Sequence, residues 1–214
     1  MTENNPHHIS SKETHFLKEH GTTILKNGYD LIPVKAESKI PAISSWQKTK
    51  ATQADLDAWS SNPSFRSVGI LTAQTPAVDI DCLDADISKR MIEFCEAKLG
   101  VAPKRVGLAP KTILVYRTET PFKKIQSPAF LDPEGRKHQV EVLGDRNQFI
   151  AFGIHPNTRK PYTWSETSIL DVPQNQLPLI TKEQAQEIAD YFVSIVPEDW
   201  KEVGTGTQPQ IEAS

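Results

Sequence analysis

Two aspartates, Asp79 and Asp81, stand in the otherwise apolar stretch "AVDIDC" at positions 77–82. Such a stretch is typical of a buried strand, in which alternate side chains point to the same face, so the two carboxylates lie about 6.5 Å apart on one face. Like charges at that spacing repel one another unless protons or cations separate them. Because hard divalent cations prefer carboxylate oxygens, the spacing indicates a metal site.

A third acid, Glu141, interrupts one face of another apolar stretch, "QVEVLG". Together with Asp79 and Asp81 it would form a triad able to hold two Mg²⁺ or Mn²⁺ ions about 3.5 to 4 Å apart, an arrangement that promotes in-line attack at phosphorus. The residue types are equally compatible with acids that lie on the surface or form salt bridges with arginines.

Positive groups that could neutralise a polyphosphate gather in one part of the chain. Between Lys104 and Lys160 there are eleven lysines and arginines against five acids, although the net charge of the whole chain is -3. The candidates are Arg105, Lys111, Arg117 and His155. Lys111 and Arg117 are expected on the same face of one strand. The alternatives are cations that protect an edge strand from aggregation and, for His155, a structural histidine.

Helical periodicity and capping residues predict four helices. They are expected from about Ser10 to Asn27, from the N-cap Thr52 over "TQADLDAW", over "DADISKRMIEFCEAKLG", and from Thr181 to just before Pro197. Strands are predicted at 29–34, 67–72, 77–82, 111–118, 138–144 and 148–153, the last two joined as a hairpin by a tight "DRN" turn. Because helices and strands do not alternate strictly, an α+β fold with mixed or antiparallel sheets is favoured.

The length of 214 residues suits one large domain or two closely packed lobes. Disorder is expected for residues 1–9 and a flexible tail or linker for 201–214, which leaves 10–200 as the folded domain. Cys82 and Cys95 are expected to be buried, reduced thiols. A polar N-terminus and the lack of an apolar run of about 18 residues predict a cytoplasmic protein with no membrane partner.

Six segments follow one another in a characteristic order between about Gly28 and Trp164. They are "GYDLIPV", "SKIPAISSW", "SVGILT", "AVDIDCLD", "RVGLAPKTILVYRT" and "VEVLGDRNQFIAFGIHPNTRKPYTW". In this order they resemble the bifunctional primase-polymerase domain of the archaeo-eukaryotic primase superfamily, in its phage and plasmid form. The resemblance implies an α+β catalytic core of two lobes, one related to the RNA-recognition fold, with the active site in the cleft between them. It also implies template-directed synthesis and extension of primers from nucleoside triphosphates on single-stranded DNA.

The resemblance also implies roles for individual residues. The ligands of two Mg²⁺ or Mn²⁺ ions would be Asp79, Asp81 and Glu141. The histidine of the family's middle motif is missing from "APKTILVYRT". The incoming triphosphate is therefore assigned to Arg105, Lys111 and Arg117. His155 is the expected replacement for the missing imidazole.

Two other functions stay open. The same acids could direct water at a phosphodiester in a metal-dependent nuclease, and the missing histidine is compatible with a catalytically inactive relative that binds nucleotides or nucleic acid. Lys39 and Trp46 of "SKIPAISSW" are candidates for contact with the template. A helicase domain or protein is a further expected partner. Arg159 stands where related sequences commonly have glycine.

Overall fold

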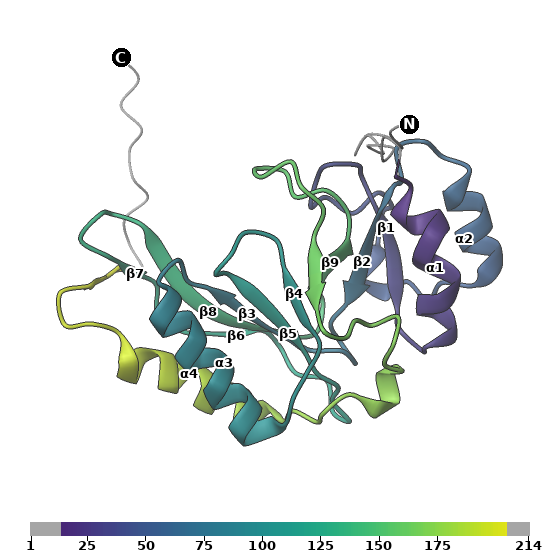
Figure 1. Ribbon diagram of the computed structural model, residues 1–214. Coiled ribbons are helices and arrows are strands. Elements are labelled where there is room, and N and C mark those ends of the chain that lie inside the picture. Colours follow the sequence, from purple (N-terminus) through teal and green to yellow (C-terminus); the bar gives the residue numbers. More distant parts are fainter. Residues whose placement is uncertain (1–13, 205–214) are drawn as a thin grey trace, which may run out of the picture.

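The structure is a computed structural model that describes residues 14–204 (Figure 1). The segments 1–9 and 205–214, for which disorder or flexibility is expected, lie outside the described residues, as does the start of the helix predicted from Ser10. Within the described part, four α-helices and two sheets of antiparallel strands confirm the predicted α+β class. No helix in this part is both long and apolar enough to cross a membrane.

The helices lie close to their predicted positions. They are α1 (Phe16–Lys26), α2 (Gln53–Ser60), α3 (Ala85–Leu99) and α4 (Lys182–Ile195), with two short 3₁₀ turns, η1 (Trp46–Lys48) and η2 (Gln174–Gln176). The strands are β1 (Leu31–Val34), β2 (Ser67–Leu71), β3 (Ala77–Asp81), β4 (Lys104–Val106), β5 (Thr112–Val115), β6 (Ile125–Gln126), β7 (Phe130–Leu131), β8 (Lys137–Leu143), β9 (Gln148–Phe152), β10 (Thr163–Ser165) and β11 (Lys201–Glu202). Of the flexible tail or linker predicted for 201–214, Lys201–Glu202 form β11, which pairs with β7.

Local sequence signals account for several helix ends. Thr52 and Thr181 each form a capping box with the residue three positions on, as their sequences predict. Gly28 and Gly100 follow α1 and α3 with positive φ angles of 83° and 97°, the conformation in which glycine ends a helix at least cost. These four helix ends therefore agree with signals that are local in the sequence.

The small sheet has the order β1-β2-β9 and apolar residues on both faces. On one face, α1 and α2 pack against Val68 and Ile70. On the other face, Ile43 and Trp46 of the loop after β1 pack over Ile32, which closes that side as well. Figure 1 shows α1 and α2 on the side of this sheet that faces away from the large sheet.

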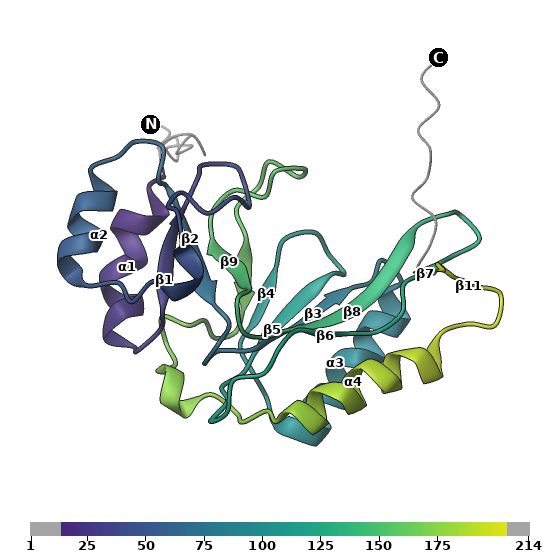
Figure 2. The same ribbon diagram turned by 180° about the vertical axis from the view of Figure 1, so that it is seen from behind.

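The large sheet has the order β10-β4-β5-β3-β8-β7-β11, with β6 also paired to β8. α3 and α4 both cover one face of it, as the view from behind shows (Figure 2). Val78 and Ile80 of β3 point into this helical side and are completely buried. Since side chains alternate along a strand, Asp79 and Asp81 point to the opposite face, which carries no helix.

The two sheets share a continuous apolar core at one end of this helix-free face. Ala77, Ile113 and Leu143 of the large sheet lie in the same buried cluster as Phe149 and Ala151 of β9. Ala77 begins the strand that carries both aspartates, so the face is apolar where the small sheet covers it and acidic where the cover ends. The fold therefore places the aspartates beside the border between the two sheets.

The predicted hairpin between 138–144 and 148–153 is wrong, because β8 and β9 belong to different sheets. Both neighbouring positions of β8 are taken, by β3 on one side and by β6 and β7 on the other. β9, apolar on both faces, instead pairs with β2 in the sheet that is covered on both sides. The Thr72 hydroxyl holds the crossover by donating to the carbonyl oxygen of Gly144 at 2.6 Å.

The tight packing around Gly144 leads to a testable prediction about this crossover. A Cβ atom at Gly144 would overlap the carbonyl oxygen of Phe122, a backbone atom that cannot swing away. We expect Gly144→Ala to lower the free energy of unfolding by about 1 to 3 kcal/mol, the usual cost of overpacking. Urea unfolding would measure this loss. Gly204→Ala, where no atom lies near the added methyl group, should leave stability unchanged, and equal stability of the two variants would contradict the packing argument.

Candidate active site

The three predicted acids meet on the helix-free face of the large sheet. β3 and β8 are antiparallel neighbours, and their register sets Asp79 directly opposite Glu141. Cβ atoms of directly opposite residues in such a pair lie about 4.5 to 5.5 Å apart. Asp81 lies opposite Gln139, one step further on the same face. The structure therefore brings the three acids of the sequence analysis together.

Two of the three carboxylates are paired with lysines. Asp81 contacts the Nζ atom of Lys111 at 2.6 Å, and Glu141 contacts that of Lys124 at 2.8 Å. Asp79 forms no hydrogen bond or ion pair with any residue among 14–204. Over the same residues, no three His, Cys, Asp or Glu side chains lie close enough to hold one metal ion as they stand. The acids are thus adjacent in the sheet without forming a closed coordination sphere.

The surroundings of Asp79 disfavour the charged form of its carboxylate. Burial raises its pKa to about 6, the positive charge of Arg105 opposes that rise, and the negative charges of Asp81 and Glu141 add to it. A partly buried carboxylate with no hydrogen-bond donor and two acidic neighbours is stabilised by a proton or by a cation. Carboxylate oxygens of this kind suit a hard divalent ion, and Asp79 is the one of the three acids whose carboxylate is not already paired with a lysine.

A hollow beside the aspartates collects most of the predicted cationic groups. It is lined by Lys39, Asp79, Asp81, Arg105, Gly107, Leu108, Lys111, Thr112, Ile113, His155 and Tyr162. Lys39 comes from the loop after β1 and His155 from the chain after β9, so both lie on the side of the small sheet. Tyr162 directly precedes β10, and the remaining groups belong to β3, β4, β5 and the segments that flank them. The hollow is therefore formed by parts of both sheets.

Arg105 lies in the hollow as a buried cation. Its side chain points to the same face as Asp79, because both residues pair with Ile113 of β5, one from each side. The guanidinium carbon lies 4.4 Å from the centre of the Tyr162 ring, which supports the charge through its π face. Neither Arg105 Nε nor the Tyr162 hydroxyl has a hydrogen-bond partner within the described chain. Buried polar atoms of this kind are normally satisfied, and a bound polar ligand would satisfy them.

His155 is held in one tautomer by its own loop. Its Nδ1 atom accepts hydrogen bonds from the backbone N–H groups of Asn157 and Thr158, both at 3.2 Å. Burial lowers the pKa of His155, and the charges of Lys39, Arg105 and Lys111 lower it further. The imidazole is therefore neutral with its proton on Nε2, from which it can donate to an anionic oxygen.

The structure does not bring Arg117 to this hollow. Its Nε atom donates to the carbonyl oxygen of Leu177 at 3.0 Å, and Glu119 lies 3.5 Å from its guanidinium. The sequence predicts Lys111 and Arg117 on one face of a strand, but β5 spans only Thr112–Val115, and six positions of extended chain cover about 20 Å. A shared face is therefore not a shared site, and the proposal below leaves Arg117 out of the triphosphate contacts.

Three residues that help to form the candidate site were not identified from the sequence. Tyr162 supports Arg105, Lys124 neutralises Glu141, and Gly107 leaves room for the hollow, because a Cβ atom there would lie 2.5 Å from the Tyr162 ring and 2.8 Å from His155 Cδ2. The only signal for Gly107 is its position in "RVGLAPK" between two of the predicted cations. Tyr162 and Lys124 carry no local signal, because each acts on a partner that is distant along the chain.

Arg159 occupies a backbone conformation that favours glycine. Its φ angle is 57°, which agrees with the glycine common at this position in the family it resembles. The Arg159 guanidinium forms an ion pair with Glu37, which also has a positive φ angle, 52°. This pair ties together the two loops that supply Lys39 and His155 to the hollow.

Comparison with protein families agrees with the resemblance. Residues 22–179, well over half of the chain, match the family model described as the N-terminal domain of bifunctional DNA primase/polymerases. The chain belongs to this primase-polymerase family. The match includes all three acids and every residue that lines the hollow. A comparison with curated proteins gave no match.

The raised pKa of Asp79 predicts how the stability of the protein depends on pH. The folded-state pKa of Asp79 is about 6 against 3.8 for the unfolded group, so its ionisation costs stability as pH rises from about 4 to 6. Asp79→Asn should therefore stabilise the metal-free protein by about 2 to 3 kcal/mol at pH 7.5 and only slightly at pH 4.

Urea unfolding in the presence of a chelator at both pH values would measure this difference. Asp57→Asn, on the exposed surface of α2, is the matched control and should have little effect at either pH. A variant at position 79 that is no more stable than the wild type at pH 7.5 would show that the folded protein compensates the buried charge.

Proposed function

We propose that the chain is a template-directed nucleotidyltransferase, a DNA primase and DNA polymerase that joins nucleoside triphosphates on single-stranded DNA with two Mg²⁺ or Mn²⁺ ions. The observation that supports this most is the unpaired Asp79 carboxylate, which lies opposite Glu141 and beside Asp81 at the edge of a cationic hollow. Membership of the primase-polymerase family supports the same class of reaction. In this proposal the two sheets with their helices are the two catalytic lobes, and the large one is related to the RNA-recognition fold.

The ions would be held by Asp79, Asp81 and Glu141. When bound, they would activate the attacking oxygen and stabilise the leaving pyrophosphate. Lys111 and Lys124, which pair with two of these acids in the structure, would be released to contact phosphate oxygens. This exchange of partners would allow the same carboxylates to pair with lysines in the metal-free protein and to bind metal ions during the reaction.

The chain's own residues would bind and orient the triphosphate. Arg105 and Lys111 would neutralise its charge, and the Nε2–H group of His155 would donate to a phosphate oxygen. Lys39 would add a cation from the side of the small sheet. The 3′-hydroxyl of the primer would lose its proton to water and form a bond to the α-phosphorus. The bond between the α-phosphorus and the oxygen that bridges to the β-phosphorus would break, and pyrophosphate would leave.

A second hollow offers a path for the DNA strand. It has a volume of about 420 Å³ and is lined by Ser45, Gln47, Lys48, Asp145 and Arg146. It lies where the loop after β1 meets the crossover from β8 to β9, and the neighbouring Lys123 forms a β-bridge with Asp145. Lys48, Lys123 and Arg146 outnumber the one acid here, Asp145, which lies 3.9 Å from Arg146, and the excess positive charge suits the phosphate backbone of a single strand. Trp46 packs against the small-sheet core in this structure, so the proposal does not use it for base stacking.

The catalytically inactive relative is the second candidate. It is favoured by the missing middle-motif histidine and by the lysines that occupy Asp81 and Glu141. A metal-dependent nuclease is disfavoured because a phosphodiester does not need the three cations and the imidazole that face the hollow. We also propose that the protein acts with a helicase domain or protein and that it is located in the cytoplasm.

Replacement of the aspartates tests the proposed reaction. We expect the wild type to synthesise and extend primers on single-stranded DNA with Mn²⁺ or Mg²⁺ and to release one pyrophosphate per nucleotide. The double variant Asp79→Ala and Asp81→Ala should lose at least about a thousandfold in rate, since both ions lose ligands. Asp57→Ala is the control. Equal rates in the double variant and wild type would remove the acids from the mechanism, and triphosphate binding without pyrophosphate release would favour the inactive relative.

Removal of two charges tests the strand path. Lys48→Gln together with Arg146→Gln should weaken binding of a single-stranded oligonucleotide about tenfold and reduce the salt dependence of binding by one to two phosphate contacts, roughly 0.7 to 1.4 in slope. The KM for the triphosphate should not change. Lys89→Gln with Arg90→Gln, on the exposed surface of α3, is the charge-matched control. Fluorescence anisotropy of the labelled oligonucleotide, measured at several salt concentrations, would report this binding. Identical binding curves for the two double variants would contradict the proposed path of the DNA strand.

A further inference from the structure

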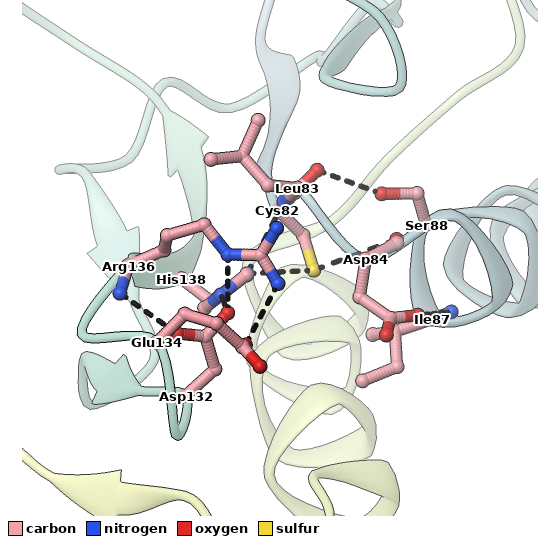
Figure 3. Close-up of polar contacts among 9 residues, drawn as sticks. All are labelled: Cys82, Leu83, Asp84, Ile87, Ser88, Asp132, Glu134, Arg136 and His138. Carbon is pink, nitrogen blue, oxygen red and sulfur yellow. Dashed lines mark hydrogen bonds and ion pairs between the residues drawn. The ribbon is translucent and has the colours of Figure 1, made fainter.

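A buried polar network lies on the helical side of the large sheet, beneath the acidic face. Figure 3 shows the His138 imidazole between Cys82 and Asp132. His138 Nδ1 lies 3.3 Å from the Cys82 sulfur, and His138 Nε2 lies 3.0 Å from Asp132 Oδ2. The side chains of His138 and Asp132 are 0% and 1% exposed, so these contacts are shielded from water.

The hydrogen bonds of the network define its proton positions. The backbone N–H of Leu83 donates to His138 Nδ1 at 3.1 Å, so Nδ1 is an acceptor and Nε2–H donates to Asp132. Burial alone would raise the pKa of Asp132. Hydrogen bonds from the Arg136 backbone, His138 and the Arg136 side chain outweigh burial and hold that pKa below its ordinary value. Asp132 is therefore a permanent anion that fixes the imidazole in this orientation.

A nucleophilic role for this Cys-His-Asp arrangement does not agree with the geometry. A catalytic thiol needs access to substrate and a lowered pKa. The Cys82 side chain is completely buried, and that burial raises the pKa of its thiol. Trp200 also covers the imidazole, with ring centres 4.0 Å apart. The network is thus closed to any substrate.

Its position in the sheet indicates a different role. The last residue pair of the β3–β8 ladder is Asp81 with Gln139, and Cys82 and His138 are the next residues on the two strands. Beyond Asp81 the chain leaves the sheet to begin α3, and the Ser88 hydroxyl holds the turn by donating to the Cys82 carbonyl oxygen at 3.0 Å. The His138 side chain therefore replaces the backbone ladder at the point where it stops.

We propose that His138 is a positioning residue for the metal-binding acids: by binding Leu83 and Asp132 it fixes the end of β3 against β8, and so fixes Asp81 relative to Glu141. The metal-binding part of this inference rests on the proposed function. His138 lies one residue from the partner of Asp81 and three residues from Glu141 on the same strand. A loosened ladder end would move the carboxylate of Asp81, which is 49% exposed and has its Lys111 contact as its one ion pair in the described chain.

Two substitutions at position 138 separate positioning from general stability. His138→Leu fills a similar volume but removes both hydrogen bonds. His138→Asn places an oxygen near Nδ1 and keeps an acceptor for the Leu83 N–H. Ile188→Val trims the same core from α4, removes none of the network's hydrogen bonds and is the stability control. If His138→Leu does not fold, Cys82→Ala and Asp132→Asn each loosen one contact and are measured in its place.

Two measurements are made on each folded variant at a temperature well below its unfolding transition. Amide hydrogen exchange at Asp81, Leu83 and Gln139 reports the ladder end without metal, and calorimetric titration with Mn²⁺ reports the acids. We expect His138→Leu to accelerate exchange at these amides and to weaken Mn²⁺ binding about tenfold to a hundredfold. His138→Asn should recover most of both losses, and Ile188→Val should show neither.

The outcomes separate this proposal from the proposed function. Faster exchange with unchanged Mn²⁺ affinity would overturn positioning of the acids, and unchanged exchange in His138→Leu would overturn the role of His138 at the ladder end. Equal losses in Ile188→Val would also overturn the proposal, because they would reflect stability alone. If the wild type binds no Mn²⁺, the proposed function fails, whereas faster exchange confined to the ladder end would still support the positioning role.

Discussion

The candidate site is arranged around one unfavourable charge. Asp79 is a partly buried carboxylate without a hydrogen-bond donor among the described residues, and it lies beside Asp81 and opposite Glu141, which raise its pKa in addition to burial. A sheet that served only to hold the fold together would have an apolar residue here, since an unpaired buried carboxylate costs several kcal/mol. In the proposed function a divalent cation completes the site and offsets this cost. Stability given up at one position is a common property of functional sites.

The rest of the fold keeps this charge accessible and surrounds it with the opposite charge. α3 and α4 fill one face of the large sheet, and the small sheet covers part of the other, which leaves the acidic end of β3 at the border. Arg105 and His155 reach the same hollow from different sheets. In the proposed function these cations bind the triphosphate, and the lysines that neutralise Asp81 and Glu141 act as replaceable counterions until metal and nucleotide bind. The network of His138 and Asp132 would then hold the floor of the site in register from the opposite face.

Much of this architecture could be predicted from the sequence, and the failures share a physical cause. The capping boxes of Thr52 and Thr181 and the alternation around Asp79 are local patterns, and they were predicted correctly. The pairing of Glu141 with Asp79 depends on strand register, which residue types do not encode. The family resemblance implied only that the three acids share one site. The prediction of a hairpin after β8 was wrong because the sheet that a strand joins depends on which of its faces are covered. Arg117 was predicted to contact the triphosphate together with Lys111, but a shared strand face says nothing about the distance between two residues along the strand. Tyr162 contributes only through a contact with Arg105 across the fold, so no local pattern could reveal it.

The central claim is that the three acids bind divalent ions while their lysine partners are displaced. Diffraction from crystals grown with Mn²⁺ and a triphosphate analogue that cannot be cleaved after the α-phosphate tests it most directly, because Mn²⁺ is located by its anomalous signal. The account predicts anomalous peaks about 2.1 Å from carboxylate oxygens of Asp79, Asp81 and Glu141, with Lys111 turned to the phosphates. Peaks elsewhere, or a bound analogue with Asp79 still unpaired and both lysine contacts intact, would contradict it.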